Sequence, residues 1–258
     1  TPWLPLLIAV LFSWYWGISG LLLFDLHVEG LALPLLLWGI YMMISGNTKR
    51  SFMLFILAMF CKEDVGIFVG MLGVYSLLRK NYKFGFILAI VGFCFSFVVI
   101  FKVMPAIRGG DLDTMARYSY LGSTPGDMLQ NLFTKPELLI EHLLKIIKVK
   151  YLLKIFLPVG AVFLLSPFTA IIFLPNLLVN LLADYPAQMS ALYQYDIMTS
   201  TGIFFATIVG ISKLEKFRIG KLSSKNIILF FSIILCVGNI LFIVRHPLLD
   251  RIRHFENR

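Results

Sequence analysis

Asp25, His27 and Glu29 alternate along the stretch FDLHVEG, which separates two apolar runs. On a helix Asp25 and Glu29 would share one face, whereas in an extended segment all three side chains would lie on one side. Either arrangement could give two ligands to a divalent cation, or a general base with its orienting partner. A polar external turn explains the same residues, with Glu29 in the first turn of the next helix, where its charge suits the helix dipole. Both interpretations stay open.

A second polar group, Lys62-Glu63-Asp64, lies between the apolar stretches ILAMFC and VGIFVGM. The apolar run that precedes it is short, so these charges are expected below the level of the lipid headgroups. Ionisable residues at that depth are costly, and they face a cavity or pair with one another. The group therefore predicts either a cavity lining or an internal pair between lysine and carboxylate that closes a tight turn.

Two further groups combine charges with aromatic side chains. The first comprises Asp111, Asp113, Arg117, Tyr118 and Tyr120. The second runs from Asp184-Tyr185-Pro186 to Tyr193-Gln194-Tyr195-Asp196. Arg117 could bind a phosphate, and the tyrosines could stack on a sugar or a lipid headgroup. Ordinary solvated loops with surface charges are the simpler explanation of both groups. The chain has no nucleotide-binding glycine loop, nucleophile elbow or His/Cys metal motif.

The elements that carry these groups have the composition of a membrane protein. Of 258 residues, 59% are hydrophobic and only 14% charged, with a mean hydropathy of +0.87. Soluble domains carry roughly a quarter charged residues. The predicted fold is all-α, a polytopic bundle of about nine transmembrane helices. The predicted spans are 3–24, 28–44, 51–61, 66–78, 84–104, 150–165, 167–183, 197–211 and 227–244.

The distribution of charge predicts the orientation of these spans. Basic loops at 45–50, 79–83 and 212–226 alternate with loops that are poor in Lys and Arg, which places the basic loops in the cytoplasm. Residue 1 is then cytoplasmic and the C-terminus external. Of 14 Asp and Glu residues, only Glu215 falls in a predicted cytoplasmic loop. The net charge of +9 lies in short clusters between spans, which favours anionic lipid as the partner and not nucleic acid.

Residues 1–244 form the predicted transmembrane domain, and residues 245–258 begin an external segment. Within the domain, the external stretch 105–149 is predicted to contain a loop followed by an amphipathic helix in the membrane interface. Thr134 and Glu137 fit a capping box at its start, and Glu137, Glu141, Lys145 and Lys148 form one polar stripe. Residues 150–183 predict a kinked hairpin that turns at Ser166-Pro167 on the cytoplasmic side.

Four segments in order resemble one family: FDLHVEGLALP, CKEDVGIFVGMLGVYSLLR, YLLKIFLPVGAVFLLSP, and LPNLLVNLLADYP with YQYD. The family comprises prokaryotic predicted membrane proteins called domain of unknown function family 2079. Phe24, Asp25, His27, Glu29 and Pro34 match its FDxHxE…P segment, and Lys62, Glu63 and Asp64 match its KED segment. Tyr193 and Tyr195 match its paired tyrosines. Gln194 stands where the family is expected to have a histidine, a departure that puts acid–base chemistry at this position in doubt.

That family is similar to the GT-C type of membrane glycosyltransferases, which take sugars from polyprenyl-phosphate donors on the external face. The resemblance implies a GT-C-like fold in a prokaryotic plasma membrane, with this chain as the C-terminal membrane half. It implies an acidic base in the first external loop, which belongs to an N-terminal region that this chain is expected to lack, and sometimes a divalent cation nearby, whose identity stays open. The expected catalytic residues are Asp25, His27, Glu29, Glu63 and Asp64. The expected substrate-binding residues are Lys62, Arg117, Tyr118, Tyr193 and Tyr195. Expected partners are membrane lipids, a polyprenyl-phosphate sugar, and an N-terminal half or other membrane subunits.

Two other classes of protein fit the sequence. A transporter or channel needs ionisable groups at mid-membrane depth and broken helices in matching halves. The ionisable residues of this chain gather at one face instead. A non-catalytic subunit of a larger membrane complex is the third class.

Overall fold

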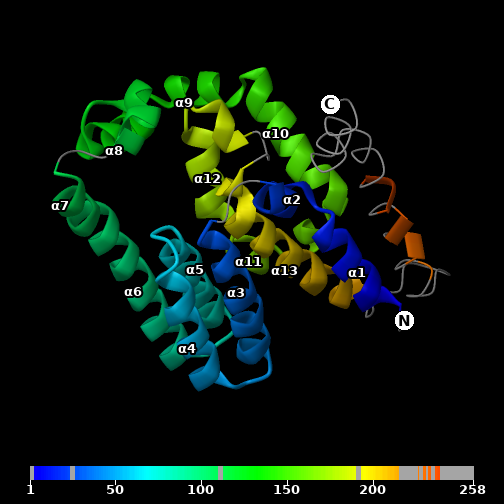
Figure 1. The fold of residues 1–258 in the computed structure, drawn as a ribbon. Helices are drawn as coiled ribbons and strands as arrows, with labels where there is room; N and C mark the ends of the chain where they lie inside the picture. The colour runs from blue at the N-terminus through cyan, green and yellow to red at the C-terminus, as the bar shows by residue number, and fades with distance from the viewer. Residues whose placement is uncertain are drawn as a thin grey trace, which may run out of the picture.

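The computed structural model describes residues 3–23, 27–109, 113–189 and 193–214, and beyond them only residues 226, 229–230, 232–233 and 236–238. The secondary structure of these residues is helical, without a strand, which confirms the all-α prediction for this part of the chain (Figure 1). The α-helices are α1 (Leu4–Ser13), α2 (Trp16–Leu23), α3 (Glu29–Ile44), α4 (Thr48–Met59), α5 (Val65–Leu78), α6 (Tyr82–Val98), α7 (Met104–Arg108), α8 (Pro125–Thr134), α9 (Pro136–Leu143), α10 (Ile146–Phe156), α11 (Pro167–Ala170), α12 (Leu174–Leu182) and α13 (Ile197–Leu214). Short turns of π- or 3-10 helix are η1 (Val99–Val103), η2 (Asp113–Leu121), η3 (Leu157–Val159), η4 (Val162–Leu165), η5 (Pro186–Met189) and η6 (Gln194–Asp196).

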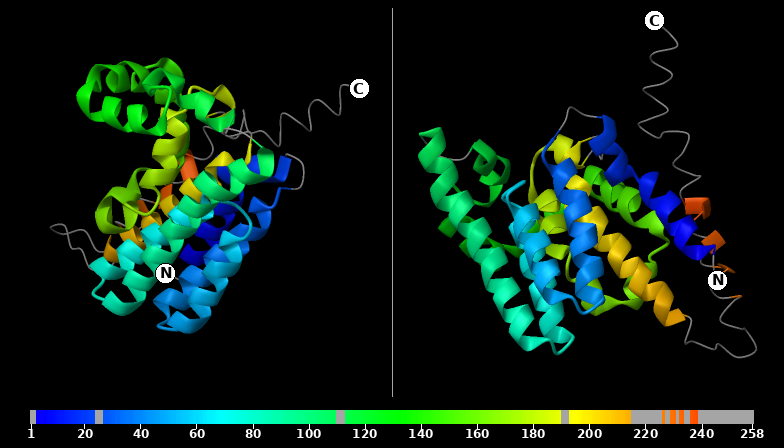
Figure 2. Two further views of the ribbon diagram at one scale, coloured as in Figure 1. Left: turned by 90° about the vertical axis from the view of Figure 1, so that its left-hand side faces the viewer. Right: turned by 60° about the horizontal axis from the view of Figure 1, so that its bottom comes forward.

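Two helical stretches of the described chain are long and apolar enough to cross a membrane, Tyr82–Ile107 and Gln194–Leu214. The first stretch contains α6 and carries an exposed stripe of Phe86, Ile90, Phe93 and Phe97. In the right-hand view of Figure 2, α6 lies at one edge of the bundle. An apolar stripe along a peripheral helix is suited to contact with lipid tails. Shorter apolar helices are α1, α3 and α5, and the bundle of nine spans stays a prediction.

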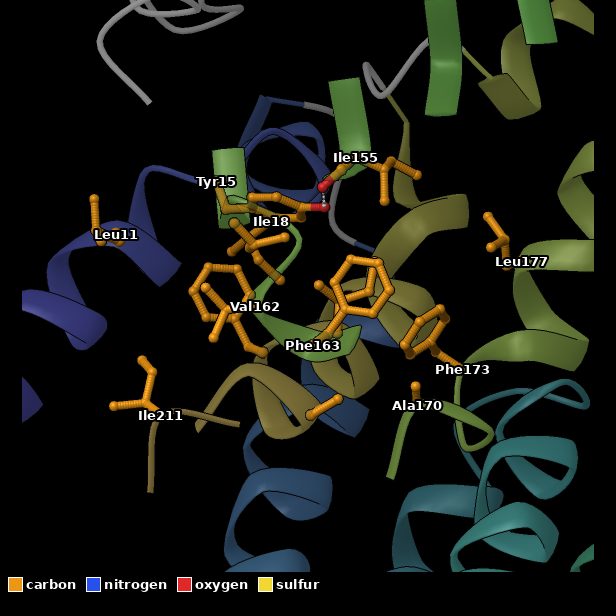
Figure 3. Packing of buried hydrophobic residues seen from close by; sticks show 14 of the residues in the cluster. Leu11, Tyr15, Ile18, Ile155, Val162, Phe163, Ala170, Phe173, Leu177 and Ile211 are labelled. Carbon is orange, nitrogen blue, oxygen red and sulfur yellow. Dashed lines mark hydrogen bonds between the residues drawn. The ribbon is translucent and has the colours of Figure 1, made fainter. Parts of the chain in front are cut away.

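Helix α13 is the centre of the bundle and joins two apolar cores. One core holds Tyr15, Tyr151, Phe163 and Phe173 together with Phe204 of α13, and Figure 3 shows part of it. The other core contains residues of α3, α4 and α5, and Phe205 of α13 packs into it. Neighbouring residues of one helix therefore face opposite cores, which explains why most residues of α13 are buried.

The predicted span 3–24 is broken at Trp14-Tyr15 into α1 and α2. Tyr15 is fully buried, and its hydroxyl donates a hydrogen bond of 2.7 Å to the carbonyl of Ile155. Ile155 lies in the last turn of α10, where carbonyls lack donors within the helix. The break lets an aromatic side chain of one segment satisfy the helix end of another, and a hydropathy pattern does not contain this contact.

The predicted spans 150–165 and 167–183 are also discontinuous. Helix α10 ends at Phe156, just before Pro158, and α12 begins at Leu174 with Pro175 in its first turn. Proline interrupts the helical hydrogen bonds at both places. The predicted turn at Ser166-Pro167 is present between η4 and α11, and the Ser166 hydroxyl donates to the carbonyl of Ala206 at 2.6 Å.

The predicted amphipathic helix of the external segment is wrong in its start and its length. Thr134 ends α8, and α9 begins at Pro136 with Lys135 as its N-cap. The capping box lies one helix earlier, where Thr124 and Asp127 open α8. The predicted polar stripe is divided because the helix breaks between Leu143 and Ile146. Lys148 is fully buried and donates to the carbonyl of Ala183, so tertiary contacts override the helical pattern.

Helices α5 and α6 approach closely through glycine, and this contact gives the first testable prediction. A Cβ at Gly92 would lie 2.4 Å from the backbone nitrogen of Gly70 and 2.6 Å from the carbonyl of Gly66. Gly92→Ala is therefore expected to destabilise the protein by about 1–3 kcal/mol, because backbone cannot move aside as a side chain can. Thermal unfolding in detergent measures this loss. Gly126→Ala, whose Cβ would meet only Thr124 Oγ1 at 3.7 Å, is the control. Equal melting temperatures for the two variants would contradict the prediction.

Candidate functional site

Glu29 and Lys62 form the centre of a cluster of charged side chains. The Lys62 Nζ lies 2.7 Å from Glu29 Oε1 and 3.6 Å from Asp64 Oδ2. His27 Nδ1 lies 3.7 Å from the other Glu29 oxygen, Oε2. The structure thus brings the first two polar groups of the sequence, FDLHVEG and KED, into direct contact.

Local structure explains how these side chains are held. Glu29 occupies the first turn of α3, and Lys62-Glu63-Asp64 forms the turn between α4 and α5. The backbone of this turn is fixed from two sides, because Ser96 donates to the carbonyl of Glu63 and Asn176 Nδ2 donates to the carbonyl of Asp64 at 3.4 Å. The side chains of the turn are therefore held at the ends of rigid helices.

The ionisable groups of the cluster differ in their pKa shifts and in their exposure. Burial lowers the pKa of Lys62, but the carboxylates of Asp64 and Glu29 outweigh burial and raise it, so the lysine is a fixed cation. Burial, opposed by Lys62, raises the pKa of the Asp64 carboxyl. The Glu29 side chain is only 5% exposed, against 30% for His27 and 29% for Asp64. Glu29 is therefore the buried centre of the cluster, while the side chains of His27 and Asp64 are partly exposed and His27 Nε2 and Asp64 Oδ1 are themselves buried.

Arg117 lies beside this cluster in an aromatic setting. Its guanidinium is 4.3 Å from the ring centroid of Tyr185 and 5.7 Å from that of Tyr195. Lys62 Nζ lies 5.6 Å from the same Tyr195 ring. Two cations therefore share one aromatic ring. Arg117 also donates a hydrogen bond of 3.0 Å to Gln188 Oε1. Within the described part of the chain, Arg117 has no carboxylate at ion-pair distance.

A chain of buried polar side chains leads from Arg117 into the bundle. Gln188 Nε2 donates to Asn180 Oδ1 at 3.3 Å, and Asn180 Nδ2 donates to Asp196 Oδ1 at 3.1 Å. The Tyr151 hydroxyl donates to the same Asp196 oxygen at 2.5 Å. Tyr151 and Asn180 belonged to none of the polar groups of the sequence, and Asp196, which ended the fourth group, was not among the expected site residues. A signal existed in LPNLLVNLL, where Asn176 and Asn180 are four residues apart and share one face of an apolar helix.

The remaining predicted residues have different surroundings. The ring of Tyr193 is tilted against that of Tyr195, with ring centroids 6.3 Å apart. The hydroxyls of Tyr118 and Tyr120 donate to the carbonyls of Val179 and Leu182, so these tyrosines fasten η2 to α12. The Glu63 carboxylate acts on Lys62 through its charge. Asp25 and Asp111 lie outside the described residues.

The expected divalent cation does not fit the described residues. No group of three His, Cys, Asp or Glu side chains in this part of the chain could hold a metal ion. The ammonium of Lys62 already occupies the position next to Glu29 that a cation would take. Lys62 thus already supplies a positive charge to Glu29 and Asp64.

Lys148 gives a prediction about pH, because burial is the largest of the effects that lower its pKa, to about 8. An unfolded lysine has a pKa near 10.4. Between these values the unfolded chain binds more protons than the folded one, so the free energy of unfolding rises with pH from about 8 to about 10.4. The expected gain is about 2–3 kcal/mol.

Melting curves of wild type and Lys148→Met across this pH range test the prediction. The variant is expected to lose the rise, because it has no ammonium to deprotonate. Lys145→Met is the control, since Lys145 forms a half-exposed ion pair with Asp184 at 3.3 Å. A wild-type profile that falls or stays level between pH 8 and pH 10 would disprove the account.

The helical fold, the lipid-suited stripe of α6 and the charged cluster at one end of the bundle define a class, the helical membrane proteins with an ionisable site. A family model described as Predicted membrane protein (DUF2079) matches residues 1–249, and the chain belongs to this family. The predicted family is thereby confirmed, and with it the membrane location. Neither the curated proteins nor the solved structures contain a match.

Proposed function

We propose that the chain is the membrane-embedded part of a GT-C-like glycosyltransferase that uses a polyprenyl-phosphate-linked sugar on the external face of a prokaryotic plasma membrane. The proposal includes the nine-span topology, with residue 1 cytoplasmic and residues 245–258 external. It also includes an N-terminal half or other membrane subunits that complete the enzyme. Its support is the resemblance together with the geometry of the site.

The observation that carries the proposal is that Arg117 has no carboxylate partner within the described part of the chain. Lys62 is compensated by Glu29 and Asp64, whereas Arg117 is held by the neutral amide of Gln188 and the rings of Tyr185 and Tyr195. A guanidinium in such surroundings keeps its charge and part of its hydrogen-bonding capacity for a ligand. Phosphate is a suitable ligand because its oxygens match the planar fork of arginine. The neighbouring tyrosine rings suit the apolar face of a sugar.

In the proposed sugar transfer, the charged cluster and Arg117 have different roles. The acceptor oxygen forms a bond to the anomeric carbon, and the bond from that carbon to the phosphate oxygen breaks. The acceptor proton passes to Asp64, whose side chain is 29% exposed and whose raised pKa makes its carboxylate a stronger base than an ordinary aspartate. The leaving phosphate keeps the electron pair of the broken bond, and Arg117 compensates the charge. Glu29 holds His27 and Lys62 in place around the base.

The test is sugar transfer by the full-length protein in proteoliposomes, with a panel of tritiated sugars on a short polyprenyl phosphate. Wild type is expected to consume at least one donor, and Asp64→Asn is expected to reduce the rate by about 10²–10⁴-fold. Glu137→Gln is the matched control, since Glu137 is an exposed acid on α9. If no donor is consumed by wild type, or if Asp64→Asn transfers at the control rate, the proposal fails.

A further inference from the structure

A second site lies at the opposite end of the bundle from the charged cluster. Helix α5 begins next to Asp64, and α13 begins next to Asp196. A rise of 1.5 Å per residue separates the two ends of these helices by roughly 20 to 27 Å. This distance is close to the roughly 30 Å thickness of the hydrocarbon core of a membrane. The far ends of α5 and α13 are therefore expected at the other membrane surface.

A cavity of about 310 Å³ opens between these far ends. Arg79 follows the last turn of α5, and Lys213 lies in the last turn of α13, and both line the cavity. Thr169 of α11 adds a hydroxyl. Lys213 Nζ donates a hydrogen bond of 3.0 Å to the carbonyl of Leu165, which holds the ammonium at the rim and leaves two N–H groups for a ligand.

The other walls of the cavity are apolar. Phe168, Leu78 and Val209 line it, with Tyr75 behind them. Phe168 is 64% exposed and Leu78 is 48% exposed, although both are large hydrophobic side chains. A ligand that covers these side chains and meets two cations at the same time must combine a negative headgroup with an apolar tail.

The surroundings of the cavity have the same sign of charge. Lys49, Arg50, Lys80 and Lys83 lie at the starts of α4 and α6 or in the turn before α6, at the same end of the bundle. The described carboxylates of the candidate site are at the other end. A basic pocket between transmembrane helices at the cytoplasmic surface is the setting in which anionic lipid headgroups bind.

We propose that this cavity binds one anionic phospholipid of the cytoplasmic leaflet. The phosphate lies between Arg79 and Lys213, and the upper part of an acyl chain covers Phe168 and Leu78. The site is separate from the proposed transferase site, and it requires only that the bundle spans the membrane with its basic loops in the cytoplasm.

The experiment compares full-length protein in nanodiscs of phosphatidylcholine with and without phosphatidylglycerol, and counts retained lipids by native mass spectrometry. We expect wild type to retain one phosphatidylglycerol that resists delipidation. Arg79→Gln/Lys213→Gln is expected to weaken retention at least tenfold. Lys49→Gln/Lys83→Gln removes the same charge from exposed positions at the same end and is expected to behave as wild type.

Two further measurements distinguish loss of the lipid site from misfolding and from binding of phosphate alone. Arg79→Gln alone changes an exposed residue, so it tests the cavity even if the double variant does not fold, and a several-fold loss is expected. Inorganic phosphate at millimolar concentration is the second ligand, and no change in melting temperature is expected. Equal loss in the Lys49/Lys83 control, retention by the Arg79 variant at the wild-type level, or stabilisation by phosphate alone would each overturn the proposal.

Discussion

Glu29→Gln is expected to lower the free energy of unfolding by about 3–5 kcal/mol, the largest effect of any single change in the cluster. The substitution keeps the volume of the side chain but leaves the Lys62 ammonium, 16% exposed, without its partner at 2.7 Å. Asp64 Oδ2, 3.6 Å from the ammonium, remains and compensates only part of its charge. The incompletely compensated cation in a poorly hydrated position is the main source of the cost.

A double-mutant cycle distinguishes this electrostatic cause from a packing defect. Lys62→Met is expected to restore most of the stability lost in Glu29→Gln, because the buried ammonium is then gone. Thermal or denaturant unfolding in detergent gives the four stabilities. If Glu29→Gln/Lys62→Met were less stable than Glu29→Gln alone, the Lys62 charge would not be the cause of the loss.

The residues that gather in the candidate site could be picked out from the sequence because polar residues in an apolar chain stand out. His27, Glu29, Lys62, Asp64, Arg117, Tyr193 and Tyr195 were all identified from their contrast with their neighbours, and the structure brings them together at one end of the bundle. Ionisable groups near lipid are expensive, so they are kept where they meet one another. This energetic cost depends on the type of residue, which can be read directly from the sequence.

The interruptions of the helices could not be predicted in the same way. Tyr15 breaks a predicted span to reach the carbonyl of Ile155, and Lys148 leaves a predicted polar stripe to reach the carbonyl of Ala183. Both contacts join residues far apart in the chain, whereas hydrophobic periodicity describes only neighbours. Asn180 and Gln188 were missed for a related reason, because neutral amides carry no charge to mark them.

These amides matter because they control the electrostatics of Arg117. A carboxylate in place of Gln188 would form an ion pair with Arg117 and compensate its charge. The amide of Gln188 instead accepts a hydrogen bond from Arg117 and donates one to Asn180, which in turn donates to Asp196. Asp196 is 1% exposed. Asp196 thus helps to hold Arg117 in position through these hydrogen bonds, without forming an ion pair that would compensate the charge of Arg117. Such an arrangement favours an anionic ligand over a purely structural role for the arginine.

Arg117→Gln is therefore expected to raise the KM for a polyprenyl-phosphate sugar by about 10–100-fold, the equivalent of losing about 1.5–3 kcal/mol from hydrogen bonds to a charged group. Arg117→Lys should recover only part of the loss, because an ammonium keeps the charge but not the planar fork. Lys135→Gln is the matched control, since Lys135 is an exposed cation at the start of α9.

The proteoliposome assay of sugar transfer measures all three variants, and melting temperatures establish that they are folded. Arg117 contacts Tyr185, Tyr195 and Gln188 but no carboxylate in the described chain, so its removal leaves no buried charge behind and the fold should persist. A KM unchanged from wild type in folded Arg117→Gln would show that the guanidinium does not meet the donor phosphate. A loss of the same size in Lys135→Gln would assign the effect to general surface charge instead.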